Sequence, residues 1–173
     1  MKKKFVIGMS GPSGAGKTTI GKKLAKKLKA KLINLDDYWK YHNTKINLKK
    51  DWKKLEHPSS IDFNNLYNDI IKSKEDSKQK KFILVEGFHL FYNKKIRNLF
   101  DLCIYITVPD HLVVKRRVDK FGPEQNQEWY SKNIVIKCYK KYGEPTKKHA
   151  DLIIRGEENI NKNIKKILAY LKK

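Results

Sequence analysis

The sequence predicts a three-layer α/β sandwich, in which a central parallel sheet of about five strands is covered by helices on both faces. Three observations lead to this prediction. Short apolar segments typical of buried strands alternate with amphipathic segments along the whole chain. The strand segments are almost continuously apolar, as expected for a parallel sheet that is buried on both faces. A glycine-rich loop joins the first strand to the first helix.

The expected strands are five short apolar runs. They cover residues 5–9, 31–35, 82–85, 102–108 and 151–154. Each run is four to seven residues long, within the usual length of a strand in a globular protein.

The expected helices follow from apolar residues that recur at helical spacing. These segments are 20–28, 61–71, a helix capped by Asp110 that runs to Val118, and 160–171. Residues 72–81 are polar and charged and are expected to form a surface turn. The stretch 120–142 is helix-like but rich in polar residues, as expected of a mobile lid. The sequence therefore predicts a single domain over residues 1–173, with a lid around 116–142.

Length and composition limit the class of protein. A chain of 173 residues can bury the core of one domain. No segment approaches the roughly 18 apolar residues of a membrane span. The apolar run after the basic start of the chain is shorter than the core of a signal peptide. Cys103 and Cys138 lack metal-ligand spacing and are expected to be buried, reduced thiols. We therefore expect a cytoplasmic protein that does not enter membranes.

The chain is strongly basic, with a formal net charge of +22. Of its 40 basic residues only four are arginine, and the lysines are dispersed along the whole sequence. Such a field attracts anionic nucleotides. The charge could also indicate a nucleic-acid-binding surface, but dispersed lysines are weak evidence for one, whereas a clustered stripe would be strong evidence. Nucleic acid is therefore kept as an alternative partner, and the oligomeric state is left open.

The glycine-rich loop has the pattern Gly-x-x-x-x-Gly-Lys-Thr of a P-loop. Glycines allow backbone N–H groups to approach phosphate oxygens, and the helix that follows adds its positive dipole. The lysine of such a loop reaches the β- and γ-phosphates, and the threonine hydroxyl ligates Mg²⁺. We therefore expect ATP and Mg²⁺ to bind here, on Gly11, Ser13, Gly14, Ala15, Gly16, Lys17, Thr18 and Thr19.

Two acidic sites follow predicted strands. Asp36 and Asp37 come after the second strand, and Glu86 ends the third. Ligands of open parallel sheets bind beyond the carboxyl ends of the strands. Phosphoryl transfer to a hydroxyl needs a carboxylate near the acceptor and a metal that neutralises charge. Asp36 fits the first role, although a helix cap or turn is an alternative reading. Glu86 fits the second, as a metal ligand together with Thr18.

Five segments together resemble the uridine kinase family of P-loop kinases. They are GPSGAGKTT, LDDYWK, LEHPSSIDF, ILVEGFHLF and EPTKKHADLII, and the resemblance covers about residues 5–154. The last segment is similar to uridine kinase, whereas LDDY and VEGF are equally similar to the related nicotinamide riboside kinases.

The resemblance implies a role for several side chains. Asp36 would be the base that takes the proton of the acceptor hydroxyl. Glu56 stands where the family usually has an aspartate that binds the ribose hydroxyls. Arg116 and Arg117 match the arginines at the start of the lid that contact the transferring phosphates. The family often continues with an Arg-Asp pair, whereas this chain has the segment VDKF.

The acceptor pocket is the part of the site with the fewest sequence signals. His57, Tyr38 and Trp129 are expected to line it, the last two by contact with a ring. The family usually carries a β-hairpin before the strand that ends in Glu86, with aromatic and histidine side chains that recognise the pyrimidine. Residues 72–81 contain neither residue type and no apolar alternation, so we expect no hairpin there.

The resemblance and the residues together predict an ATP-dependent kinase that phosphorylates the 5′-hydroxyl of a ribonucleoside, as uridine and cytidine kinases do. A nicotinamide riboside kinase is the alternative within the same class. A nucleic-acid-binding P-loop ATPase is the alternative from another class, suggested by the charge of +22.

Overall fold

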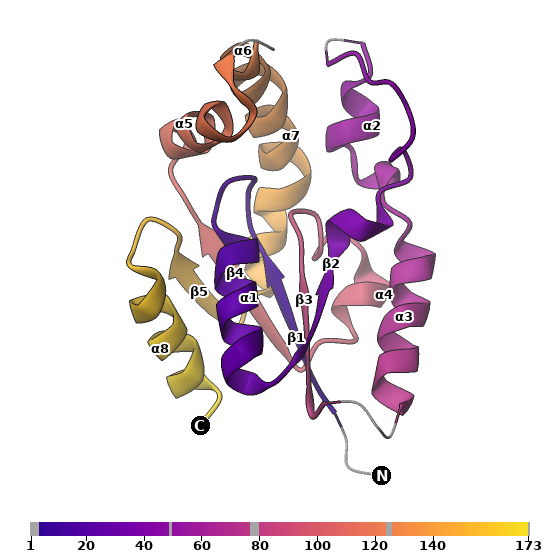
Figure 1. The fold of residues 1–173 in the computed structure, drawn as a ribbon, viewed down its shortest axis with the longest axis vertical. Coiled ribbons are helices and arrows are strands. Elements are labelled where there is room, and N and C mark those ends of the chain that lie inside the picture. The colour runs from indigo at the N-terminus through magenta and orange to yellow at the C-terminus, as the bar shows by residue number, and fades with distance from the viewer. Residues whose placement is uncertain (1–3, 49, 77–79, 124–125, 173) are drawn as a thin grey trace.

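The computed structural model describes residues 4–48, 50–76, 80–123 and 126–172. Its centre is a sheet of five parallel strands in the order β2-β3-β1-β4-β5 (Figure 1). The strands are β1 (Phe5–Ser10), β2 (Lys31–Asn34), β3 (Phe82–Glu86), β4 (Leu102–Thr107) and β5 (Leu152–Arg155). The predicted fold class is confirmed, and the strands match the predicted segments to within two residues at each end.

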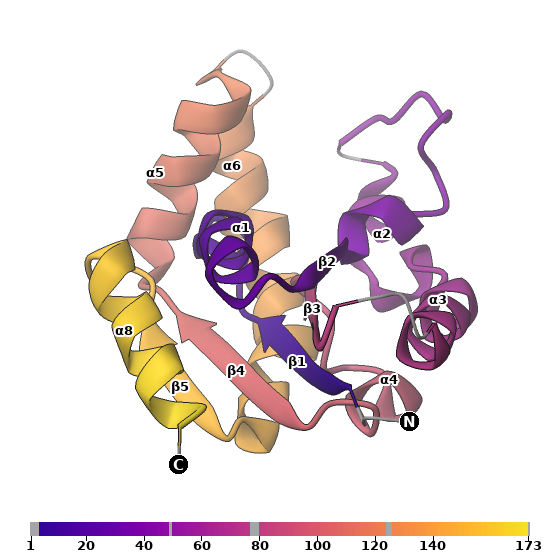
Figure 2. The ribbon, with the colours of Figure 1, turned by 60° about the horizontal axis from the view of Figure 1, so that its bottom comes forward.

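Helices cover both faces of the sheet (Figures 1 and 2). Helices α1 (Lys17–Leu28) and α8 (Ile160–Tyr170) pack on one face through buried side chains such as Ile20, Leu24, Ile164 and Ile167. Helices α3 (Phe63–Glu75) and α4 (Lys94–Arg97) pack on the other through Leu66, Ile70 and Ile96. No helix of the described residues is long and apolar enough to cross a membrane.

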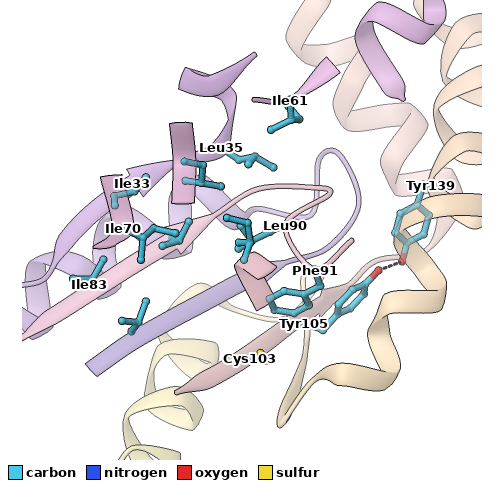
Figure 3. Close-up of a cluster of buried hydrophobic side chains, with 14 residues drawn as sticks. Ile33, Leu35, Ile61, Ile70, Ile83, Leu90, Phe91, Cys103, Tyr105 and Tyr139 are labelled. Carbon is cyan, nitrogen blue, oxygen red and sulfur yellow. Dashed lines mark hydrogen bonds between the residues drawn. The ribbon is translucent and has the colours of Figure 1, made fainter. Parts of the chain in front are cut away.

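The strands contribute to both layers of the core because successive side chains point to opposite faces. In β4, Cys103 and Tyr105 pack on the α3 side, while Ile104 and Ile106 pack on the α1 side. The buried hydroxyl of Tyr105 donates a hydrogen bond to that of Tyr139, 3.0 Å away (Figure 3). This bond ties the sheet to the π-helix Tyr139–Gly143. The predicted burial of Cys103 and Cys138 as free thiols is confirmed.

Two groups of short elements rise beyond the carboxyl ends of the strands (Figure 1). One contains the end of α5 (Asp110–Phe121), then α6 (Gln127–Tyr130), the π-helix Ser131–Val135, α7 (Ile136–Cys138) and the π-helix Tyr139–Gly143. A 3₁₀ segment, Glu144–His149, leads from there to β5. The other contains α2 (Trp52–Glu56) and a 3₁₀ turn, Pro58–Ser60. The predicted helix-like character of 120–142 is thus confirmed for the described residues, and this segment is called the lid below.

One predicted turn is partly wrong. Residues 72–75 form the last turn of α3, where the Asp76 N–H still donates to the Lys72 carbonyl. Lysine and glutamate are good helix formers and serine costs only a few tenths of a kcal/mol, about the scale of ordinary propensity differences, so they can continue a helix whose apolar face is buried. The predicted absence of a hairpin from 72–81 concerns partly residues 77–79, which lie outside the described residues.

Candidate active site

The phosphate loop depends on glycine at three positions with positive φ. A Cβ atom at Gly11 would lie 2.3 Å from the Ile106 carbonyl oxygen, and φ there is +149°. Gly14 and Gly16 have φ of +73° and +87°. No described atom lies within 4 Å of where a Cβ of Gly16 would stand, so the cradle is open on that side. The first turn of α1 has no acidic residue and no side-chain cap, which leaves its amides to an anion. The loop therefore fits the phosphates of a nucleotide.

Lys17 is the cation of this loop. Its side chain is buried, and Nζ donates to the Pro12 carbonyl oxygen at 2.8 Å. Burial lowers the pKa of Lys17, while the nearby carboxylates of Glu86 and Asp36 act in the opposite direction. The ammonium group is thus held within the loop and faces the two carboxylates predicted for chemistry.

The two predicted magnesium ligands lie side by side. The Thr18 hydroxyl donates to Glu86 Oε1 at 2.9 Å, and Glu86 is 1% exposed at the end of β3. Burial raises the pKa of Glu86, and the charge of Lys17 partly offsets this. Among the described residues, no group of three or more His, Cys, Asp or Glu side chains could hold a metal ion. A hydroxyl with one carboxylate nevertheless suits Mg²⁺, which takes its remaining ligands from water and substrate phosphates.

Asp36 is positioned by the end of β2. The Asn34 side chain accepts a hydrogen bond from the Asp36 N–H at 3.0 Å, which ends the strand and starts a 3₁₀ turn, Leu35–Tyr38. β2 therefore stops one residue before the predicted end. The turn directs Asp36, which is exposed, to a cavity that Lys17 and Glu86 also line.

Two adjoining cavities meet at the phosphate loop, and we name them the donor and acceptor cavities after the two substrates that the sequence predicts. The donor cavity, of about 690 Å³, extends from residues 13–20 along Arg116, Arg117, Lys120 and Phe121 to residues 156–160 after β5. The acceptor cavity, of about 370 Å³, lies between the lid and α2. Its described lining comprises Ser13, Gly14, Lys17, Thr18, Asp36, Leu48, Leu55, Glu56, Glu86, Gly87, Phe88, Arg117, Lys120, Phe121, Gln127 and Tyr130.

The two arginines of α5 differ in their surroundings. Arg116 lines the donor cavity, and its guanidinium donates to the carbonyl oxygens of Gly14, at 2.8 Å, and Gly156, at 3.1 Å. Arg117 lines both cavities and donates from Nη1 to Ser13 Oγ at 2.8 Å. Arg116 thus clamps the loop to the segment after β5, whereas Arg117 lies between donor and acceptor.

Glu56 joins the acceptor side to the lid. It is 6% exposed, accepts a hydrogen bond from Tyr130 Oη at 3.2 Å, and lies 3.9 Å from Nη2 of Arg117. Burial raises the pKa of Glu56, and Arg117 opposes the shift. Its backbone carbonyl accepts a hydrogen bond from His89 Nε2 at 2.7 Å. Because burial lowers the pKa of His89 to about 4, this histidine is a neutral donor that fixes the backbone of Glu56.

Three predicted acceptor residues lie elsewhere. Tyr38 Oη donates to Asp69 at 2.8 Å, the ring of His57 packs on Tyr142, and Trp129 lines a separate hollow on the outer side of the lid. None of the three is among the described residues that line the acceptor cavity. Trp129 lies two positions after Gln127 on α6, so the two side chains point in nearly opposite directions.

The sequence analysis missed Lys120, Phe121 and Gln127. Lys120 and Phe121 lie three and four residues after Arg117 on α5 and therefore share its face. Both line the two cavities, and Phe121 remains 44% exposed. Their helical spacing from Arg117 could have indicated Lys120 and Phe121 from the sequence, whereas it says nothing about Gln127.

Known proteins resemble this chain over most of its length. The AAA domain family matches residues 10–130. The uridine kinase of Borrelia garinii subsp. bavariensis is 30% identical over 200 residues, covering 96% of this chain and 94% of that protein. The uridine kinase of Lactobacillus helveticus is 27% identical over 191 residues, covering 92% and 90%. Both aligned spans exceed 173 residues, so these relatives contain segments that this chain lacks.

The fold also matches solved structures. A shikimate kinase from Acinetobacter baumannii, in complex with shikimate, superposes with a TM-score of 0.63 at 20% identity, covering 98% of this chain and 94% of that one. At this identity the likeness concerns the fold alone.

Proposed function

Because the chain belongs to the uridine kinase-like P-loop kinases and contains an AAA domain, we propose that it transfers the γ-phosphoryl group of ATP to the 5′-hydroxyl of uridine or cytidine. One observation supports this most directly. The acceptor cavity opens onto the phosphate loop, and Asp36, Lys17, Glu86 and Arg117 all line it. A hydroxyl bound there would lie between a carboxylate and the end of the triphosphate.

The residues of the chain have distinct tasks in this reaction. Asp36 accepts the proton of the attacking hydroxyl. Lys17 and Arg117 stabilise the charge that spreads over the transferring group, and Lys120 adds a third cation where the two cavities join. Thr18 and Glu86 would hold Mg²⁺, which would neutralise phosphate charge. The chain thus contributes mainly positioning and electrostatics.

The dispersed lysines do not require a nucleic-acid partner. Some of them satisfy backbone carbonyls at the starts and ends of elements. Lys4 Nζ donates to the carbonyl oxygens of Ser73, at 2.7 Å, and of Asp76, and Lys80 Nζ donates to that of Ala30 at 3.3 Å. Since the curated relatives are uridine kinases, we do not favour the nucleic-acid-binding ATPase.

Replacing Arg117 by alanine should lower kcat by about 10²-fold and raise the Michaelis constant for ATP far less, because its charge matters most in the transition state. Arg116→Ala is the matched variant on the same helix. Since Arg116 binds two carbonyl groups, this change should mainly lower the melting temperature and weaken ATP binding. Steady-state kinetics and thermal melting of both variants would check this. An equal loss of kcat in both would contradict the distinction.

A panel of acceptors tests the proposed substrate. We expect relaxed base specificity, with uridine, cytidine and nicotinamide riboside all phosphorylated, because the large apolar side chains of the acceptor cavity, Leu48, Leu55, Phe88 and Phe121, do not distinguish one ring edge from another. The measurement is kcat/KM with radiolabelled ATP for these three and deoxyuridine. Sharp selectivity for one pyrimidine would refute relaxed specificity, and no phosphorylation of any nucleoside would refute the function.

The same panel tests Glu56 as the ribose ligand. Glu56→Ala should reduce kcat/KM for all three ribosides by roughly 10- to 100-fold, since each presents the same ribose diol and a lost charged hydrogen bond is costly. Glu128→Ala, at an exposed position of the lid, serves as the control. Equal use of uridine and deoxyuridine by the parent would remove Glu56 from this role.

A further inference from the structure

Gln127 is a buried amide in the wall of the acceptor cavity that has an unused hydrogen-bonding atom. It is 4% exposed and lines the cavity from the first position of α6. Its Oε1 atom is buried and accepts no hydrogen bond from any residue that the structure describes. A buried amide oxygen without a partner is unfavourable, so such an atom indicates a missing donor.

The position of Gln127 relative to Glu56 suggests which part of a bound nucleoside would carry the missing hydrogen-bond donor. Gln127 and Tyr130 are three residues apart and lie on one face of α6, about 4.5 Å apart along its axis. Tyr130 bonds to Glu56, which we propose as the ligand of the ribose diol. Gln127 and Glu56 line the same cavity, so a ring attached to that ribose can reach Gln127.

The apolar part of the cavity lining suits a flat ring. Leu48, Leu55, Phe88 and Phe121 are the large apolar side chains among the described lining residues. Phe121 keeps 44% of its surface exposed although it is a phenyl group at the junction of two polar cavities. Apolar faces hold a ring without distinguishing its edges, so discrimination must come from a polar side chain.

We propose that Gln127 recognises the edge of the acceptor's ring through its side-chain amide. This inference rests on the proposed function and names the specificity-determining residue of that site. An amide offers one acceptor oxygen and an NH₂ donor, and it can present them in either order by a rotation. It therefore complements uracil, cytosine and a ring-borne carboxamide, each of which places a donor beside an acceptor. Oε1 is closed to solvent without ligand, so recognition of the ring requires a rotation of the Gln127 side chain that turns its amide into the cavity.

The test compares Gln127→Met with the parent. Methionine keeps the length of the side chain and removes the amide. Asn133→Leu is the control, because Asn133 lies in the hollow on the outer side of the lid, where its Nδ2 donates to the Trp129 carbonyl at 2.9 Å. The acceptors are uridine, cytidine and phenyl riboside, in which a phenyl group replaces the base and leaves no polar edge. kcat/KM is measured for the parent and both variants with each of the three acceptors, and the melting temperature is measured for each protein.

The expected result is a loss of roughly 10- to 100-fold for uridine and cytidine in Gln127→Met, with phenyl riboside changed less than about twofold. The melting temperature should be equal to or above that of the parent, since a buried amide with an unpaired oxygen is replaced by an apolar group. Asn133→Leu should keep the parent's preference among the three acceptors.

Two results would overturn the role of Gln127 without affecting the proposed function. One is an equal loss of kcat/KM for phenyl riboside, which would indicate a structural role. The other is no loss of kcat/KM for any acceptor. If the parent phosphorylates no riboside at all, the proposed function is wrong and the inference falls with it. The parent's activity on uridine therefore separates the two failures.

Discussion

Lys17→Ala is expected to reduce kcat by at least about 10²- to 10³-fold while the fold persists. Lys17 is the buried cation of the phosphate loop, and alanine removes the charge that would stabilise the transferring phosphoryl group. The substitution should cost little stability, because burial disfavours the charged ammonium group and so offsets the hydrogen bond that it donates to the Pro12 carbonyl oxygen. Kinetics with uridine and thermal melting measure the two effects separately.

The control for this variant is Lys23→Ala, an exposed lysine of the same helix, which should leave both quantities near the parent values. Near-normal turnover by Lys17→Ala with normal melting would show that the phosphate loop has been misinterpreted. A large loss of melting temperature would instead indicate that Lys17 holds the loop through Pro12.

Asp36→Asn is expected to lower kcat by roughly 10²- to 10⁴-fold with ATP binding largely intact. The amide keeps the size of the side chain but cannot take the proton of the acceptor hydroxyl. Asp36 lines the acceptor cavity beside Lys17 and Glu86, so it is placed for this task. Single-turnover kinetics and a separate measurement of ATP affinity would show whether the loss lies in the chemical step.

The neighbouring carboxylate provides a matched control. Asp37 is exposed, follows Asp36 directly, and is absent from the described lining of either cavity. Asp37→Asn should therefore retain activity within a few-fold of the parent. If kcat falls in Asp37→Asn and not in Asp36→Asn, the base has been assigned to the wrong carboxylate.

The sequence predicted most of the fold because each strand is a short apolar run that can be recognised from neighbouring residues alone. Runs such as 82–85 and 102–106 consist of hydrophobic residues throughout, which suits strands buried on both faces. The short helices α2 and α4 were not predicted, since four or five residues are too few for a helical period to emerge. The last turn of α3 was missed because its polar residues extend a helix whose apolar face ends at Ile70.

The candidate site was predictable where one continuous segment forms it. The phosphate loop has a positive φ angle at Gly11, Gly14 and Gly16, and glycine is the residue that adopts such angles readily. The spacing of its glycines therefore predicts the loop from the sequence. The acceptor cavity combines side chains of the lid, α2 and the segment after β3, and its lining depends on which way each side chain points. Trp129 was favoured for its large ring, yet the helical turn directs it outward and places Gln127 inside. Residue type alone could not decide between them.

The shared wall of the two cavities has a thermodynamic consequence. Arg117, Lys120 and Phe121 line both cavities, and Arg117 contacts Ser13 on one side and Glu56 on the other. A nucleotide that attracts Arg117 alters its ion pair with Glu56, and a nucleoside that engages Glu56 alters the contact with Ser13. Linkage requires the two effects to be equal, so the factor by which donor changes acceptor affinity equals the factor by which acceptor changes donor affinity. Arg117 would then carry a part of any substrate synergism, which should decrease when that side chain is removed.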